Sequence, residues 1–193
     1  MALVDRVKKI LLSPKTEWEV IDAEPTTVAD LYKGYIIPLA AIGPVAQAIG
    51  FSVFGMSVPF LGTYRTPIGS AVTQAVVSYV LMLVAVFVLA IIIDALAPTF
   101  NGTQNRIQAL KVAAYSYTAS WVGGIFMLIP MLSMLAILLG FYSLYLLYLG
   151  LPVLMKSPKE KAMSYTVVVI LAAIVLFMLI GFVGTLFVRM PMG

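Results

Sequence analysis

The chain of 193 residues contains no cysteine and no histidine. Their absence excludes a thiol nucleophile, disulfide bonds, zinc sites built on cysteine or histidine, and acid–base catalysis by histidine. Charged residues are also scarce, at 10% of the chain against about 25% in an average soluble domain. Hydrophobic residues make up 62%, and the mean hydropathy is +1.07. A soluble domain of this size could not bury so much apolar surface, so we expect an integral membrane protein.

The few charged residues divide the chain into two parts. Eleven of the twenty lie in residues 1–33, and four uncharged stretches follow at 34–64, 66–93, 112–155 and 162–188. About 20 apolar residues cross a hydrocarbon core roughly 30 Å thick, and the third stretch is long enough for two spans divided near Pro130. These stretches do not alternate in polarity, which favours helices over a barrel. The sequence therefore predicts an all-α integral membrane protein with an N-terminal segment, 1–33, and a membrane domain, 34–193. Five transmembrane helices are predicted at about 35–55, 69–93, 112–130, 133–154 and 164–188.

The distribution of lysine and arginine predicts the orientation. If the N-terminus lies inside, the inside segments carry ten of these residues and the outside segments carry two. Basic residues concentrate in cytoplasmic loops, so the N-terminus is predicted in the cytoplasm and the C-terminus outside. In this orientation Asn101-Gly102-Thr103 lies in an inside loop, and we interpret it as an Asn-Gly turn rather than a glycosylation site.

The N-terminal segment is predicted to form short helices. Residues 3–12 place their apolar side chains in an arc of about 120°, with Asp5, Arg6, Lys8 and Lys9 on the opposite, polar side. Such an amphipathic helix can lie in the lipid headgroup layer, or it can pack on the inner face of the protein itself. Residues 15–24 form a second short helix. The pattern Thr27-Val28-Ala29-Asp30 is typical of a helix start leading into the first span.

Two groups of residues inside the spans invite specific interpretations. Ser116, Ser120 and Gly124, with Gly123 beside them, line one helix face with small side chains and predict a close helix–helix contact, within one chain or between two. Asp94, Gln74 and Tyr145 are candidates for a polar or ion site, because acids in membrane segments are often functional. The alternative for Asp94 is an interfacial acid that pairs with Arg106 or Lys111. The alternative for Gln74 and Tyr145 is an ordinary hydrogen bond between helices.

Short motifs resemble those of the Yip family of Ypt/Rab-interacting proteins. Asp30-Leu31-Tyr32 followed by Gly34-Tyr35 resembles the family's Asp-Leu-Tyr-Gly signature, here interrupted by Lys33. Tyr115 after Ala114 resembles its Gly-Tyr motif, and the segment from Leu146 to Met163 resembles the end of the fourth span in prokaryotic members. The resemblance implies five spans, a cytosolic N-terminus and partner binding rather than catalysis. A prokaryotic chain has no vesicle traffic, so the Rab-binding role of eukaryotic members is not carried over.

The residues and the resemblance together predict a non-catalytic adaptor in the cytoplasmic membrane. It would bind the lipid bilayer, self-associate or join other subunits, and recognise a protein partner at its cytosolic face. The candidate partner-binding residues are Asp30, Leu31, Tyr32, Gly34 and Tyr35. No catalytic residue, cofactor or metal site is predicted, and a net charge of +4 is too small and too scattered to indicate nucleic acid. The alternative function is a small-solute or ion transporter or channel that acts as an oligomer.

Overall fold

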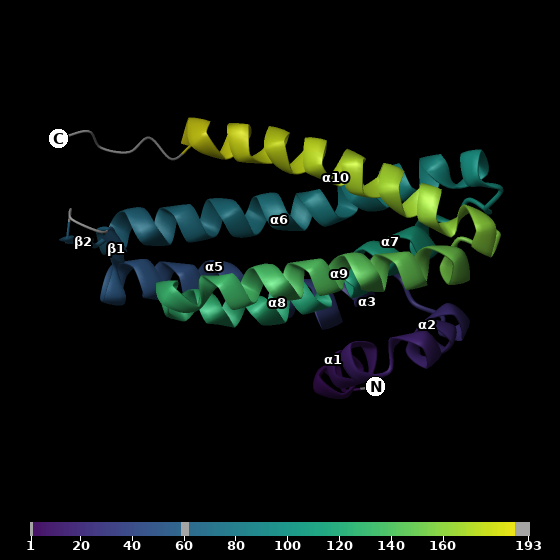
Figure 1. Cartoon of the computed structure of the whole chain (residues 1–193), viewed down its shortest axis with the longest axis horizontal. Helices are drawn as coiled ribbons and strands as arrows, with labels where there is room; N and C mark the ends of the chain where they lie inside the picture. The colour runs from purple at the N-terminus through teal and green to yellow at the C-terminus, as the bar shows by residue number, and fades with distance from the viewer. Residues whose placement is uncertain (1, 59–61, 188–193) are drawn as a thin grey trace.

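The computed structural model describes residues 2–58 and 62–187, and long helices dominate it (Figure 1). Within these residues, four helical stretches are long and apolar enough to cross a membrane: Val28–Phe54, Ile68–Phe100, Pro130–Leu154 and Lys159–Thr185. The prediction of an all-α membrane protein is therefore confirmed. The predicted outside C-terminus, including residue 188 of the last predicted span and the domain end at 193, lies outside the described residues.

The first stretch is irregular because it contains two prolines. It consists of α3 (Val28–Leu31), a π-helical turn (Tyr32–Ile36), α4 (Ile37–Ala40), α5 (Ile42–Ile49) and a second π-helical turn (Gly50–Phe54). Proline removes a backbone donor and its ring clashes with the carbonyl four residues earlier. The wide turn at Tyr32–Ile36 precedes Pro38, and the break at Ala41 precedes Pro44. A short antiparallel ribbon, β1 (Met56–Val58) and β2 (Gly62–Tyr64), follows at the end of the bundle away from the N-terminus (Figure 1).

The third predicted span is not one continuous helix. The chain forms α7 (Arg106–Ser116), α8 (Thr118–Gly123) and two 3₁₀ segments, Gly124–Leu128 and Pro130–Leu132. The Thr118 hydroxyl donates to the Tyr115 carbonyl over 2.7 Å, which competes with the helical hydrogen bonds and ends α7 at Tyr117. The pair Gly123-Gly124 then weakens the helix further. The structure therefore supports four long spans, and a fifth at 112–130 stays a proposal.

The helices of the predicted third span form the centre of the bundle. α7 is buried from Ala109 to Ser116 and packs between α6 (Ile68–Leu96) and α9 (Ser133–Leu154), while α5 packs on α6 and on the 3₁₀ segment after α8. α10 (Lys159–Phe187) lies at the periphery against α6 and α9 (Figure 1). On α6 a stripe of exposed valines repeats every fourth residue, at Val72, Val76, Val80 and Val84, as expected for a face covered by lipid.

The loop after α6 contains the predicted Asn-Gly turn. A 3₁₀ turn, Ala97–Phe100, is followed by Asn101 in the left-handed conformation (φ 57°), and the Gly102 N–H donates to the Ala97 carbonyl over 2.8 Å. A Cβ at Gly102 would lie 2.7 Å from the Met155 carbonyl oxygen, so only glycine fits there. The turn thereby holds this loop against the end of α9.

Two short helices, α1 (Leu3–Leu12) and α2 (Pro14–Ala23), pack beside the bundle at one end (Figure 1). Ile10 of α1 is fully buried, and the Tyr142 hydroxyl of α9 donates to the Leu11 carbonyl over 2.8 Å. Val4 and Leu12 remain exposed on the outer side of α1. This helix therefore packs on the protein and still presents an outer surface that a lipid headgroup layer could contact.

Candidate functional site

The two motif segments meet in the structure, although about 80 residues separate them in sequence. The rings of Tyr35 and Tyr115 lie 4.5 Å apart between centroids. The Thr118 proton is donated to the Tyr115 carbonyl, so the Tyr35 hydroxyl donates to Thr118 Oγ1 over 2.7 Å. Both tyrosines and Leu31 are buried. The Tyr32 hydroxyl donates to the Leu83 carbonyl of α6 over 2.8 Å. The wide turn at Tyr32–Ile36 thus anchors the first span on the centre of the bundle.

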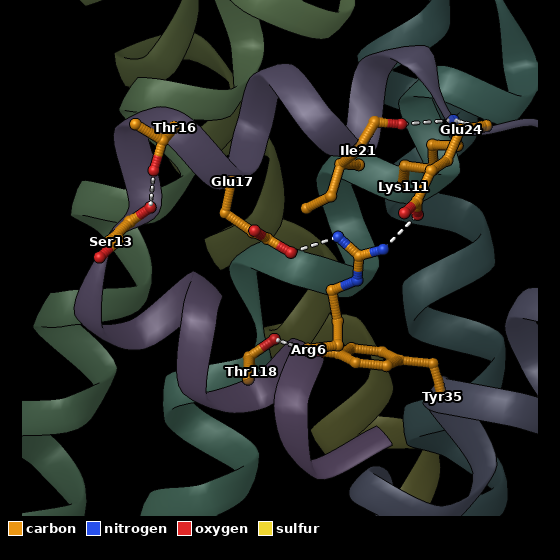
Figure 2. A network of polar contacts seen from close by, with 9 residues as sticks. All are labelled: Arg6, Ser13, Thr16, Glu17, Ile21, Glu24, Tyr35, Lys111 and Thr118. Atoms are coloured by element: carbon orange, nitrogen blue, oxygen red, sulfur yellow. Dashed lines mark hydrogen bonds and ion pairs between the residues drawn. The ribbon is translucent and has the colours of Figure 1, made fainter. Parts of the chain in front are cut away.

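A buried ionic cluster holds α1 and α2 beside this junction. The Arg6 guanidinium donates to the carboxylates of Glu17 and Glu24 (Figure 2). Its central carbon lies 5.7 Å from the centroid of the Tyr115 ring. Arg6 is only 5% exposed, although the sequence placed it on the polar side of an amphipathic helix. This burial was not expected from the polar side of the helix, and it is possible because two acids of the following segment neutralise the guanidinium.

The ionic cluster shifts the pKa values of its members. The hydrogen bond from Arg6 lowers the pKa of Glu24 below its usual range, and burial opposes this only in part. Burial alone would lower the pKa of Arg6, but the hydrogen bond with Glu24 and the neighbouring carboxylates outweigh it and raise the pKa. Both groups are therefore charged at neutral pH, and their attraction favours the docked position of α1 and α2.

Lys111 of α7 fixes the end of α2. Its Nζ donates to the carbonyls of Ile21 and Glu24 over 2.8 and 2.6 Å (Figure 2). The last carbonyls of a helix lack intrahelical donors, and a cation there also interacts favourably with the helix dipole. Burial lowers the pKa of Lys111. In addition, Lys156 pairs with Asp22. Residues 1–33 are thus bound to both later segments whose basic residues the sequence analysis predicts inside.

The side chain of Trp18, on α2, fills the space between that helix and the bundle. Its side chain is fully buried, and its ring lies edge-on to Tyr115 at 6.3 Å between centroids. The ring fits because residue 150 of α9 is glycine: a Cβ there would lie 2.6 Å from Trp18 Cζ2. Nothing in the sequence pairs Trp18 with Gly150, so this contact could not be predicted.

A polar cleft of 280 Å³ opens where these parts meet. It contains four of the five candidate partner-binding residues, and Tyr32 lies outside it. Its lining residues are Leu3, Arg6, Glu24, Thr26, Asp30, Leu31, Gly34, Tyr35 and Tyr115. Asp30 and Gly34 are exposed, whereas Leu31 and Tyr35 form the buried wall. We name this the motif cleft.

Asp30 also has a structural role at the rim of the motif cleft. Its backbone N–H donates to Thr27 Oγ1 over 3.1 Å, and the Thr27 hydroxyl donates to Asp30 Oδ2 over 2.6 Å. This reciprocal contact caps α3 as the sequence pattern predicts. A change at Asp30 therefore affects the start of the first span as well as the cleft, and a test of recognition needs a second position.

The candidate small-residue face lies against other helices of the same chain. A Cβ at Gly124 would lie 2.7 Å from the Cα of Gly43 in the first stretch, and a Cβ at Gly123 would lie 2.9 Å from Leu139 of α9. The hydroxyls of Ser120 and Ser143 lie 2.8 Å apart. Ser116 is buried, and its Oγ has no hydrogen-bond partner among the described residues.

The three candidates for a polar or ion site are not brought together. Asp94 lies 3.9 Å from Arg106, one of the two pairings expected of an interfacial acid. Gln74 lies 20 residues earlier on the same helix, about 30 Å away at 1.5 Å per residue. Tyr145 is on α9, 41% exposed and in contact with Tyr142. Among residues 2–58 and 62–187, no group of three or more acidic residues is arranged to hold a metal ion.

The fold defines a polytopic helical membrane protein whose N-terminal helices dock on its own bundle beside a motif-lined cleft. The sequence model of the Yip1 domain matches residues 8–180, so the chain belongs to the Yip1 domain family. It is similar to the inner membrane protein YohC of Escherichia coli, from strain K12 and from an O6:H1 strain. The identity is 27% over 157 residues, covering 79% of this chain and 80% of each relative. No solved structure matches the chain.

Proposed function

We propose that this protein is a non-catalytic adaptor of the prokaryotic inner membrane that recognises a protein partner at its cytoplasmic face. The observation that carries the proposal is the motif cleft, where α1, the connector after α2 and both family motif segments converge. The cleft opens at the surface beside the exposed residues Asp30 and Gly34, so side chains of a docking segment can reach it.

The chemistry of the motif cleft fits a polar docking segment. Glu24 and Asp30 supply carboxylates and Thr26 supplies a hydroxyl, while Tyr35 and Tyr115 supply an aromatic wall. The exposed outer side of α1, with Lys8 and Lys9, would at the same time contact the lipid headgroup layer. Self-association would need another surface than the small-residue face, because that face already contacts helices of the same chain.

The proposal includes five spans with the N-terminus in the cytoplasm. Within the predicted fifth span, 112–130, residues 112–128 are helical apart from the break at Tyr117, and about 17–25 residues are enough to cross a bilayer, which supports a fifth crossing. Lys111 and Lys156 both contact the N-terminal segment, so the basic segments predicted inside lie at one end of the bundle. The similarity to an inner membrane protein of Escherichia coli supports the location.

A crosslinked pull-down from native membranes tests the proposal. A Cβ at Gly34 would meet nothing within 4 Å, so Gly34→Leu should fill the motif cleft without disturbing the fold. Gly69→Leu is the matched control, since Gly69 is also open but lies at the start of α6. We expect partner recovery to be lost in Gly34→Leu and retained in Gly69→Leu. Equal recovery from both variants would contradict the proposal.

Substitution of the candidate partner-binding residues themselves provides a second test of the proposal. Asp30→Ala with Tyr32→Ala should also abolish recovery, but the helix cap at Asp30 stabilises by about 0.5–2 kcal/mol. Thermal stability must therefore be measured beside binding. If stability and binding fall together, loss of the cap and of the Tyr32 hydrogen bond explains the lost binding. The result for Gly34→Leu then decides whether the partner docks in the motif cleft.

Transport remains the second candidate because one oxygen of Asp94 is buried without a hydrogen-bond partner among the described residues. A transporter needs this acid to change charge or coordinate an ion. Asp94→Asn should be silent in the pull-down. A solute or ion flux in proteoliposomes that Asp94→Asn abolishes would replace the adaptor with a transporter.

A further inference from the structure

The charged side chains of the motif cleft leave an excess of negative charge. The lining carries one cation, Arg6, and two carboxylates, Glu24 and Asp30. The Arg6 side chain is only 6% exposed, and its guanidinium is already paired with Glu24 and with Glu17, which does not belong to the lining. Lys111 is also outside the lining, and its ammonium is bonded to two backbone carbonyls. A group that enters the motif cleft therefore meets net negative charge.

Both carboxylates of the motif cleft keep one oxygen free for an occupant. Arg6 donates to Glu24 Oε2, and the Thr27 hydroxyl donates to Asp30 Oδ2. The other oxygen of each carboxylate accepts no hydrogen bond from the described residues. The Glu24 side chain is 42% exposed and Asp30 is exposed, so a group from outside can reach both.

Tyr115 adds a third acceptor, which lies deeper. The residue lines the motif cleft and is only 8% exposed. The hydroxyl of Tyr35 is bonded to Thr118, but that of Tyr115 makes no hydrogen bond in the part of the chain that the structure describes. Its oxygen is not one of the fully shielded atoms, and it is close enough to Arg6 and Glu24 for their charges to act on it. A buried hydroxyl without a partner is unfavourable, so an occupant that bonds it gains affinity.

The three acceptors favour a guanidinium as the occupant. They come from three elements, because Glu24 follows α2, Asp30 is on α3 and Tyr115 is on α7. A guanidinium carries five N–H donors in one plane and can serve several acceptors at once. It is also more weakly hydrated than the ammonium of lysine, so it leaves water at a lower cost to reach a hydroxyl that is almost buried. A neutral side chain would gain less from the two carboxylates, and an acidic one would be repelled.

We propose that the docking segment of the partner places an arginine side chain in the motif cleft, with its guanidinium on Glu24, Asp30 and the Tyr115 hydroxyl. This inference rests on the proposed function and adds the chemistry by which the partner is recognised. Glu24 then has two roles, because one of its oxygens holds Arg6 and the other binds the partner.

Two capped tripeptides test the requirement for charge. Acetyl-Gly-Arg-Gly-amide carries a guanidinium, which a neutral urea of nearly the same shape replaces in acetyl-Gly-citrulline-Gly-amide. Dissociation constants for the full chain are measured by saturation-transfer NMR in dodecyl maltoside, a detergent without charge or amine. The wild-type protein should bind the arginine peptide at least about tenfold tighter, the effect of one hydrogen bond between charged groups. Asp30→Asn should remove most of this preference and keep the helix cap, because its amide oxygen still accepts from the Thr27 hydroxyl.

Tyr115→Phe tests the buried hydroxyl separately. The phenyl ring keeps the contacts with Tyr35 and Trp18, and the lost hydroxyl has no partner in the described chain. Thermal stability should therefore stay unchanged, while affinity for the arginine peptide falls about tenfold. Gly34→Leu should abolish binding of the peptide, and the matched control Gly69→Leu should bind it as the wild type does.

Three results would each overturn the inference: equal affinity for the two peptides, an unchanged affinity in Tyr115→Phe, or binding that persists in Gly34→Leu. Phosphatidylethanolamine, whose headgroup carries an ammonium, should not displace the arginine peptide. Displacement by this lipid would overturn the inference and assign the motif cleft to a headgroup. Equal peptide affinities together with loss of partner recovery in Gly34→Leu would remove the arginine and leave the adaptor, whereas retained recovery in Gly34→Leu would contradict the adaptor itself.

Discussion

Adding one methyl group at position 150 should release the N-terminal helices. In Gly150→Ala, the new Cβ would lie 2.6 Å from Cζ2 and 2.8 Å from Cε2 and Cη2 of Trp18. Real Cβ atoms do not approach other atoms so closely, and the indole is rigid. Either the ring leaves its site or α2 moves away from α9. The substitution therefore acts directly on the contact that holds α2 in place.

The expected magnitude follows from the burial of Trp18. A buried tryptophan removes about 150–250 Å² from water. At about 25 cal/mol per Å², complete expulsion of the ring would cost about 4–6 kcal/mol. Partial accommodation would cost about 1–3 kcal/mol, as in other overpacked contacts. Gly150→Ala should therefore weaken docking of the N-terminal helices by about 1–3 kcal/mol or more, despite the better helix propensity of alanine.

Trypsin digestion in mild detergent measures this opening. Lys8, Lys9 and Lys15 are exposed but lie in helical backbone, so cleavage requires α1 and α2 to open. Since 1.4 kcal/mol is a factor of ten, cleavage at these sites should accelerate about 5- to 150-fold. Gly140→Ala on the same helix α9 is the control, because its Cβ meets nothing within 4 Å. Equal cleavage rates in the two variants would refute the packing of Trp18 on Gly150.

Three further predictions concern the bundle, the ionic cluster and the orientation. Gly124→Leu should lower the thermal unfolding temperature in detergent, since its Cβ would meet backbone atoms at 2.7 Å; an unchanged temperature would contradict this packing. Because Arg6 lowers the pKa of Glu24 below 4.5, docking of α1 and α2 should be strongest above about pH 5.5 and weaken as pH falls through the lowered pKa. Hydrogen exchange of residues 3–23 should show this loss of protection at low pH in the wild type but not in Glu24→Gln. The chain lacks cysteine, so a cysteine at Tyr64 should react with an external thiol reagent in intact cells, whereas one at Gln104 should not.

The charge pattern predicted most of the fold because a membrane protein excludes charges from its spans. The predicted range 133–154 coincides with α9, and 69–93 lies within α6. The break at Tyr117 was not predictable, because it depends on the Thr118 hydroxyl bonding a backbone carbonyl rather than on hydropathy. The same limitation applies to the first stretch, because hydropathy does not indicate the wide turn at Tyr32–Ile36.

The sequence indicated only one side of the motif cleft. The motif from Asp30 to Tyr35 supplies one side of it, and a family resemblance was enough to select those residues. Arg6 and Glu24 supply the other side, and they pair although 18 positions separate them in sequence. Periodicity had assigned Arg6 to the polar face of its helix, so the pattern did not indicate this contact. Two carboxylates following a short basic helix are too common a pattern to indicate a buried pair.

Site-specific photocrosslinking in intact cells tests the central claim most directly. A photoreactive amino acid placed at Thr26 or Leu3 would lie in the motif cleft, whereas one at Val80 would lie on the valine stripe of α6. Our account predicts a discrete protein adduct from both cleft positions and none from Val80. The adduct at Thr26 should also disappear when Gly34→Leu fills the cleft. Adducts from Val80 alone, or an adduct at Thr26 that persists in Gly34→Leu, would contradict a partner site in the motif cleft.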